Sequence, residues 1–78
     1  MNDIIITKQQ IKNAEEMLRK CYYIAVQTDE DMGNKDGENF LSDNPDYLYY
    51  KACIDMLNRL GLDVQRTNRR GKIVHLIY

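Results

Sequence analysis

The chain of 78 residues is poor in the side chains that build disulfide frameworks, metal sites and catalytic dyads, with two cysteines, one histidine and no tryptophan. A secreted domain of this size usually carries several cysteine pairs, so we interpret Cys21 and Cys53 as buried thiols. These two cysteines and the distant His75 lack the spacing of metal ligands. We therefore predict that the protein binds no cofactor and no metal ion.

The motifs of the common enzyme classes are also missing. The sequence contains no GxSxG, Walker A or GxGxxG pattern, and no Ser or Cys lies close enough in sequence to His75 to form a nucleophilic pair. Glu15 and Glu16 are adjacent on a predicted helix and point in different directions, unlike an acid and base pair. A domain this small would also have difficulty enclosing a substrate pocket of several hundred Å³. We predict that the protein is not an enzyme.

Long apolar runs are absent as well. No window approaches the roughly 20 apolar residues of a membrane-spanning helix. The first residues, Met1 to Asp3 followed by three isoleucines, lack the charged flank and long apolar stretch of a signal peptide. We expect a cytoplasmic protein without membrane contact. With 44% hydrophobic and 29% charged residues, the chain has the balance of an ordered protein, and its length allows one domain over residues 1–78.

Two amphipathic helices are predicted by apolar residues at spacings of three and four. The first follows Thr7, a favoured N-cap residue, and ends near Thr28. The second begins after Asn44, another favoured cap, with Pro45 in the first helical position, and ends at Gly61. A β-branched run from Asp3 to Thr7 predicts a short strand before the first helix.

After Gly61 the apolar period changes to two, which predicts a C-terminal β-hairpin. Asn68 and Gly71 supply the turn because both tolerate the backbone conformations of hairpin loops. The return strand, Lys72 to Tyr78, is apolar on both faces, so we expect it to lie centrally with Ile4 to Ile6 on its other side. The predicted fold is a small two-layer α+β domain in the order β-α-α-β-β, with two helices on a two- or three-stranded antiparallel sheet.

Charge is unevenly distributed along the chain. Residues 29 to 46 hold seven carboxylates against Lys35 alone, a net charge of −6, whereas residues 59 to 72 hold five cations against Asp63, a net charge of +4. An acidic loop (29–44) therefore precedes a basic hairpin (62–78). Asn34 to Gly37 resembles the middle of an EF-hand calcium loop, but Met32 stands where that loop needs its first carboxylate. The loop is either a solvated connection or a surface for a basic partner.

Six tyrosines in so short a chain predict that two or three hydroxyls reach the surface, where tyrosine is enriched at protein interfaces. Ordinary amphipathic packing is the alternative for these rings. The candidate protein-binding residues are Asp29, Glu30, Asp31, Asp36, Glu38, Tyr47 and Tyr50.

The C-terminal part, residues 45–78, resembles the end of winged-helix DNA-binding domains at the level of fold alone, since a helix, a glycine and a hairpin with a basic tip follow one another. The resemblance implies phosphate contacts by Arg66, Arg69, Arg70 and Lys72. Asp43 and Asp46, at the start of the would-be recognition helix, would repel phosphate. A charged tip that keeps a sheet edge soluble is the structural alternative.

Two functional hypotheses follow. We favour a small protein-binding regulator or inhibitor, of the kind found on phages and other mobile elements, that uses the acidic loop and surface tyrosines. A nucleic-acid-binding module that uses the basic hairpin is the alternative. The acidic segment and the overall pI of 5.7 oppose non-specific affinity for nucleic acid. A homodimer is compatible with both hypotheses.

Overall fold

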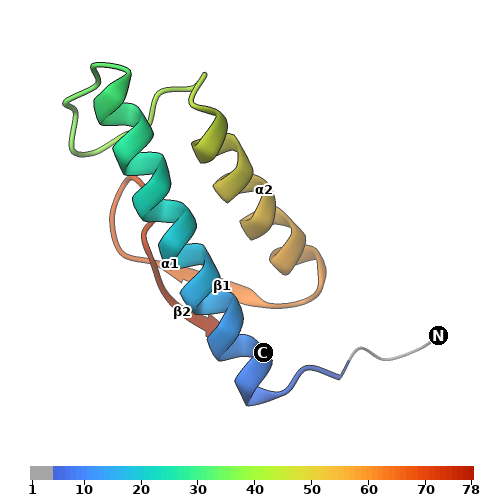
Figure 1. The fold of residues 1–78 in the computed structure, drawn as a ribbon. Helices are drawn as coiled ribbons and strands as arrows, with labels where there is room; N and C mark the ends of the chain where they lie inside the picture. Colours follow the sequence, from blue (N-terminus) through green and yellow to red (C-terminus); the bar gives the residue numbers. More distant parts are fainter. Residues whose placement is uncertain (1–4) are drawn as a thin grey trace.

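Two long helices and a β-hairpin form a two-layer structure, which the computed structural model describes for residues 5–78 (Figure 1). The elements are α1 (Lys8–Asp31), α2 (Pro45–Arg59), β1 (Asp63–Arg66) and β2 (Ile73–Ile77). The helices lie side by side in opposite directions, and the hairpin lies behind them in the view of Figure 1. This arrangement confirms the small α+β fold. Within residues 5–78, no helix is long and apolar enough to cross a membrane.

Helix α1 begins where the sequence predicts but continues one turn further. Thr7 and Gln10 form a capping box, in which the Thr7 hydroxyl accepts from the Gln10 amide at 3.1 Å and the Gln10 side chain accepts from the Thr7 amide at 2.9 Å. The helix reaches Asp31, and Gly33 (φ +89°) then ends it. Carboxylates in a last helical turn oppose the helix dipole, yet Glu30 and Asp31 continue α1 past the predicted end near Thr28.

Helix α2 has the predicted boundaries. The Asn44 side chain accepts from the backbone amides of Asp46 and Tyr47 at 2.9 and 3.1 Å, and Pro45 occupies the first helical position. Gly61, with φ +90°, follows the C-terminal cap residue Leu60. These caps provide partners for backbone groups that a helix end leaves free.

The sheet of residues 5–78 has two strands, β1 and β2, paired antiparallel with Val64 opposite Leu76. The expected first strand is wrong for Ile5 to Thr7, which lie outside any strand, while Asp3 and Ile4 lie outside the described residues. Helix α1 packs against β2 in place of the expected third strand. The Arg19 guanidinium of α1 donates to the Val74 carbonyl of β2 at 3.1 Å.

The core lies between the helices and the hairpin. Its buried members come from both helices and from β2, and they are Leu18, Tyr22, Tyr50, Ile54, Ile73 and Leu76. The Tyr22 ring meets the rings of Phe40 and Tyr50 edge to face, with centroids 5.7 and 5.9 Å apart. Burying a large apolar side chain stabilises a fold by about 1.5–3 kcal/mol, so this cluster holds the two layers together.

Candidate functional site

Asp29, a candidate contact residue, lies inside the protein. Its side chain is 0% exposed, and its two oxygens accept hydrogen bonds from three groups. The Asn44 side-chain amide donates at 2.6 Å, that of Asn34 at 2.8 Å, and the backbone amide of Leu41 at 3.2 Å. The hypothesis that Asp29 contacts a partner is therefore wrong, because this carboxylate folds the connection between the helices.

Asn44 links this carboxylate to both helices. The side chain is fully buried, and its amide nitrogen donates to the Ala25 carbonyl of α1 at 2.9 Å as well as to Asp29. Its oxygen meanwhile caps α2. Every polar group of Asn44 therefore has a partner, as buried amides require. One side chain fixes the N-terminus of α2 against the last turns of α1.

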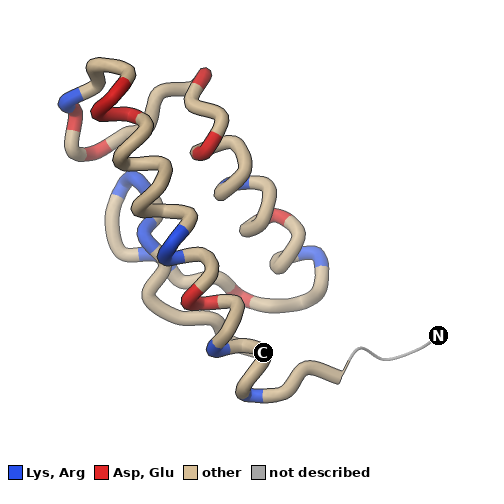
Figure 2. The backbone as a smooth tube through the Cα atoms, in the orientation of Figure 1, with Lys and Arg blue, Asp and Glu red and all other residues tan. Residues whose placement is uncertain are grey.

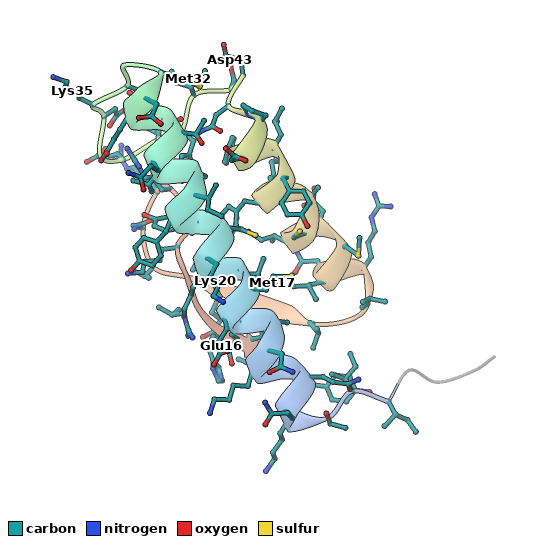
Figure 3. All side chains as sticks on the ribbon, viewed as in Figure 1. Glu16, Met17, Lys20, Met32, Lys35 and Asp43 are labelled. Carbon is teal, nitrogen blue, oxygen red and sulfur yellow. The ribbon has the colours of Figure 1, made fainter. Side chains whose placement is uncertain are left out.

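The rest of the acidic loop divides into paired and free carboxylates. Asp36 accepts from the Glu38 backbone amide at 2.9 Å, and Glu38 forms an ion pair with Arg69 at 3.0 Å. Glu30 and Asp31 are exposed, and within residues 5–78 no ion pair or side-chain hydrogen bond engages their carboxylates, so they stay candidates for contact with a partner. In Figure 3, Lys35 and Asp43 point away from the body of the molecule.

The acidic loop and the basic hairpin tip, which the sequence indicated as separate sites, lie in contact. Figure 2 shows the carboxylates of the loop at one end of the molecule, with the cations of the tip next to them. Besides the Glu38 to Arg69 pair, the Arg70 guanidinium donates to the Asp36 carbonyl and lies over the Phe40 ring, 4.9 Å from its centroid. The loop thus covers part of the tip that was expected to face phosphates.

The four candidate phosphate contacts differ in accessibility. Arg70 is only 8% exposed, so the hypothesis that its side chain reaches a duplex backbone is wrong. Arg66 and Arg69 are exposed, and the Lys72 ammonium lies over the Tyr23 ring, 5.4 Å from its centroid. Arg66 and Arg69 remain accessible to a large polyanion.

Tyr50 is a core residue and not a surface tyrosine. Its side chain is 1% exposed, and its hydroxyl donates to the Gly71 carbonyl. Burial raises the pKa of Tyr50 to about 12. Tyr47 is half-buried and stacks on Phe40 with centroids 4.9 Å apart. The exposed tyrosines include Tyr49, which is 60% exposed.

An apolar stripe on the outer face of the helix pair was missed by the sequence analysis. It consists of Met17 and Ile24 on α1 and Tyr49 and Met56 on α2, which are between 43% and 62% exposed. Each helix contributes residues seven apart, so the two side chains of a helix lie in one row. Figure 3 shows Met17 on the side of α1 that faces α2. The seven-residue spacing was a signal in the sequence, but apolar residues beside a core face are ordinarily assigned to the core.

The two cysteines lie between the rows of the stripe. Both are half-buried and free. Burial raises the pKa of the Cys21 thiol above its ordinary 9.0, and the proximity of Cys53 and then Asp46 adds to the rise. Cys53 also raises the pKa of the Tyr49 hydroxyl, by its charge and by a hydrogen bond. These interactions place Cys21, Cys53 and Tyr49 along one seam between the helices, and the raised pKa of Cys21 makes its thiol a weak nucleophile.

The remaining candidate for chemistry, His75, lies on β2 beside α1. Its Nδ1 atom lies 3.5 Å from a Glu15 oxygen, and Arg19 lies 3.6 Å from the same carboxylate. No three His, Cys, Asp or Glu side chains of residues 5–78 are grouped to hold a metal ion. Comparison with protein-family models, curated proteins and solved structures gave no match.

Proposed function

We propose that the protein is a small non-enzymatic protein-binding module whose partner docks on the apolar stripe. The observation that carries the proposal is the exposure of Met17, Ile24, Tyr49 and Met56, which lie outside the core cluster and, by helical spacing, flank the seam of Cys21 and Cys53 between the helices. Exposed apolar side chains gathered on one face are typical of interaction sites, and Tyr and Met are enriched at interface centres. In this proposal the apolar stripe, and not Tyr47 and Tyr50, forms the surface that binds the partner.

Charge at one end of the stripe indicates the chemistry of the partner. Asp31 follows Ile24 by seven residues and so continues the row on α1, while Asp46 lies in the first turn of α2. The partner we propose offers an apolar ridge or helix that is flanked by basic residues. In this proposal the module acts in the cytoplasm as a regulator or inhibitor, consistent with its free cysteines.

The test compares charge variants in the stripe with neighbours outside it. A tagged protein recovers partners from a bacterial lysate, and each recovered protein is purified and titrated by calorimetry. Met17→Glu and Met56→Glu should each weaken binding at least tenfold, because a buried carboxylate would lose its water without gaining a partner. Glu16→Gln alters the exposed neighbour of Met17, which lies on the side of α1 away from α2 in Figure 3, and should leave affinity unchanged.

Two results would contradict the proposal. In one, Glu16→Gln weakens binding as much as Met17→Glu. In the other, light scattering shows a homodimer that Met17→Glu dissociates, so that a second copy of the chain occupies the stripe. Circular dichroism of each variant checks that the fold is retained, which we expect because the substituted positions are exposed.

Nucleic-acid binding is the second candidate, favoured by a small cationic cavity beside the hairpin tip. The cavity has a volume of about 110 Å³, and Lys51, Arg66, Arg69 and Arg70 line it against one carboxylate, Asp55. Titration into labelled duplex DNA and RNA at two salt concentrations tests this function. Phosphate contacts predict binding that weakens steeply with salt and falls further in Arg66→Ala. Absence of binding at low salt eliminates this candidate.

A further inference from the structure

We propose a second binding site, for a small phosphate-bearing ligand, in the pocket between α1, the acidic loop and the hairpin tip. The site lies apart from the apolar stripe and does not depend on the protein-binding function. The pocket has a volume of about 400 Å³, within the range of small-molecule sites. Its polar and charged lining consists of Glu30, Asn34, Lys35, Asn68, Arg70 and Lys72, beside the rings of Tyr22 and Tyr23.

The charge of this lining favours an anion with more than one negative charge. Arg70 and Lys72 lie beside one carboxylate, Glu30, and Lys35 lies at the rim with its side chain pointing away from the body of the molecule (Figure 3), so the lining residues have a net charge of +2. In residues 5–78 no carboxylate lies within ion-pair distance of Lys35, Arg70 or Lys72, although Glu38 pairs with the neighbouring Arg69. A phosphate dianion matches this charge, and lysine and arginine are the side chains that bind phosphate oxygens.

Arg70 supplies the observation that points to a ligand. The side chain is more than nine-tenths buried, yet its Nε atom has no hydrogen-bond partner in the described part of the chain. Its other contacts, the Asp36 carbonyl and the Phe40 ring, are neutral and hold the guanidinium in place without cancelling its charge. Buried charges in folded proteins are ordinarily paired. A dianion in the adjoining pocket would compensate this charge.

The remaining side chains limit the size and shape of the ligand. The Asn68 amide is engaged with the Tyr22 hydroxyl at 3.2 Å, so Asn68 shapes the wall of the pocket. Tyr23, which is exposed, has the Lys72 ammonium over its ring. This pair places a cation and an aromatic surface together at the pocket, an arrangement that fits a phosphate attached to a flat organic group. A nucleoside monophosphate is therefore the organic probe of choice.

The test titrates ¹⁵N-labelled protein with inorganic phosphate, pyrophosphate, AMP and a 5′-phosphorylated oligonucleotide at constant ionic strength set with chloride. Phosphate, pyrophosphate and AMP should saturate amide shifts around residues 34–37 and 68–72, while chloride should not. Lys72→Gln should weaken AMP binding at least fivefold. Lys12→Gln removes the same charge from an exposed position on α1 outside the pocket and should leave AMP binding unchanged.

Three outcomes would overturn the proposal. In the first, AMP fails to shift these amides at millimolar concentration. In the second, Lys12→Gln weakens binding as much as Lys72→Gln, which indicates attraction by the overall charge of the protein and not a site. In the third, an oligonucleotide binds equally well with and without its terminal phosphate, so that the backbone of a polymer is the ligand. Arg70→Met removes a buried charged side chain, so a loss of binding in this variant could come from unfolding. Arg70→Lys, which keeps the positive charge, is therefore measured beside it. Both should lose AMP binding more than tenfold while the dispersion of the spectrum shows that Arg70→Lys stays folded.

Discussion

Asp29→Asn should destabilise the protein strongly, although the sequence alone favours the opposite sign. A carboxylate in the last turn of a helix opposes the dipole, and its removal would ordinarily stabilise by about 0.3–1 kcal/mol. The structure instead shows Asp29 fully buried, with both oxygens accepting from amide donors. In the variant, one oxygen becomes an NH₂ group that faces a donor. Hydrogen bonds to a charged group contribute about 1.5–3 kcal/mol each.

We expect the loss of one such bond, with weakening of the others, to lower the free energy of unfolding by about 3 kcal/mol. A domain of this length has a total stability of about 4–12 kcal/mol. Urea denaturation followed by circular dichroism at pH 7 measures the change. With an m-value of about 1 kcal/mol/M for a small domain, the midpoint should fall by about 3 M.

Asp31→Asn is the matched control, two residues further along the same helix and exposed. Its midpoint should stay within about 0.5 M of the wild type, because exposed substitutions change stability by about 0.5 kcal/mol or less. If Asp29→Asn unfolds at the same urea concentration as the control, the carboxylate does not hold the connection between the helices, and our assignment of Asp29 is refuted.

Three further predictions concern the same contacts. Asn44→Asp keeps a good helix cap but places a carboxylate against Asp29, so calorimetry should show unfolding at a temperature at least 10 °C lower, whereas Asn44→Ser should be milder. Tyr50→Phe leaves the Gly71 carbonyl without its donor and should cost about 1–2 kcal/mol at pH 7. Because the folded pKa of Tyr50, about 12, exceeds its ordinary 10.0, the wild type should lose about 3 kcal/mol between pH 10 and 12 in urea titrations, and the variant should not. Glu38→Gln should change the free energy of unfolding by less than about 1 kcal/mol, because its ion pair with Arg69 is exposed. In salt-dependent binding assays the variant should bind nucleic acid more tightly, since Arg69 loses its anionic partner. Weaker binding would contradict the pairing of Glu38 with the hairpin tip.

Local signals predicted most of the fold. Thr7, Asn44 and Gly61 mark helix ends through hydrogen bonds to near neighbours, and such contacts are readable from the sequence. The expected strand at Ile5 failed because pairing with β2 depends on contacts far apart in the chain. The same reason explains Asp29, whose partners at positions 41 and 44 lie 12 and 15 residues away.

The candidate sites were less predictable than the fold. Charge runs correctly located an acidic loop and a basic tip, but only the tertiary structure brings Glu38 against Arg69 and Arg70 beneath the loop. Tyr50 was assigned to the surface, whereas the structure buries Tyr50 and leaves Tyr49 exposed. Exposure of the apolar stripe depends on where the hairpin packs, which periodicity alone leaves open.

The proposal that the stripe binds a partner is tested most directly by site-specific photo-crosslinking in living cells. A photoreactive amino acid is placed at Met17, on the stripe, or at Glu16, the adjacent exposed residue that faces away from α2. We predict a discrete adduct with a second, different protein from position 17 and none from position 16. Equal adducts from both positions, or an adduct at position 17 that contains only copies of this chain, would contradict the proposed function.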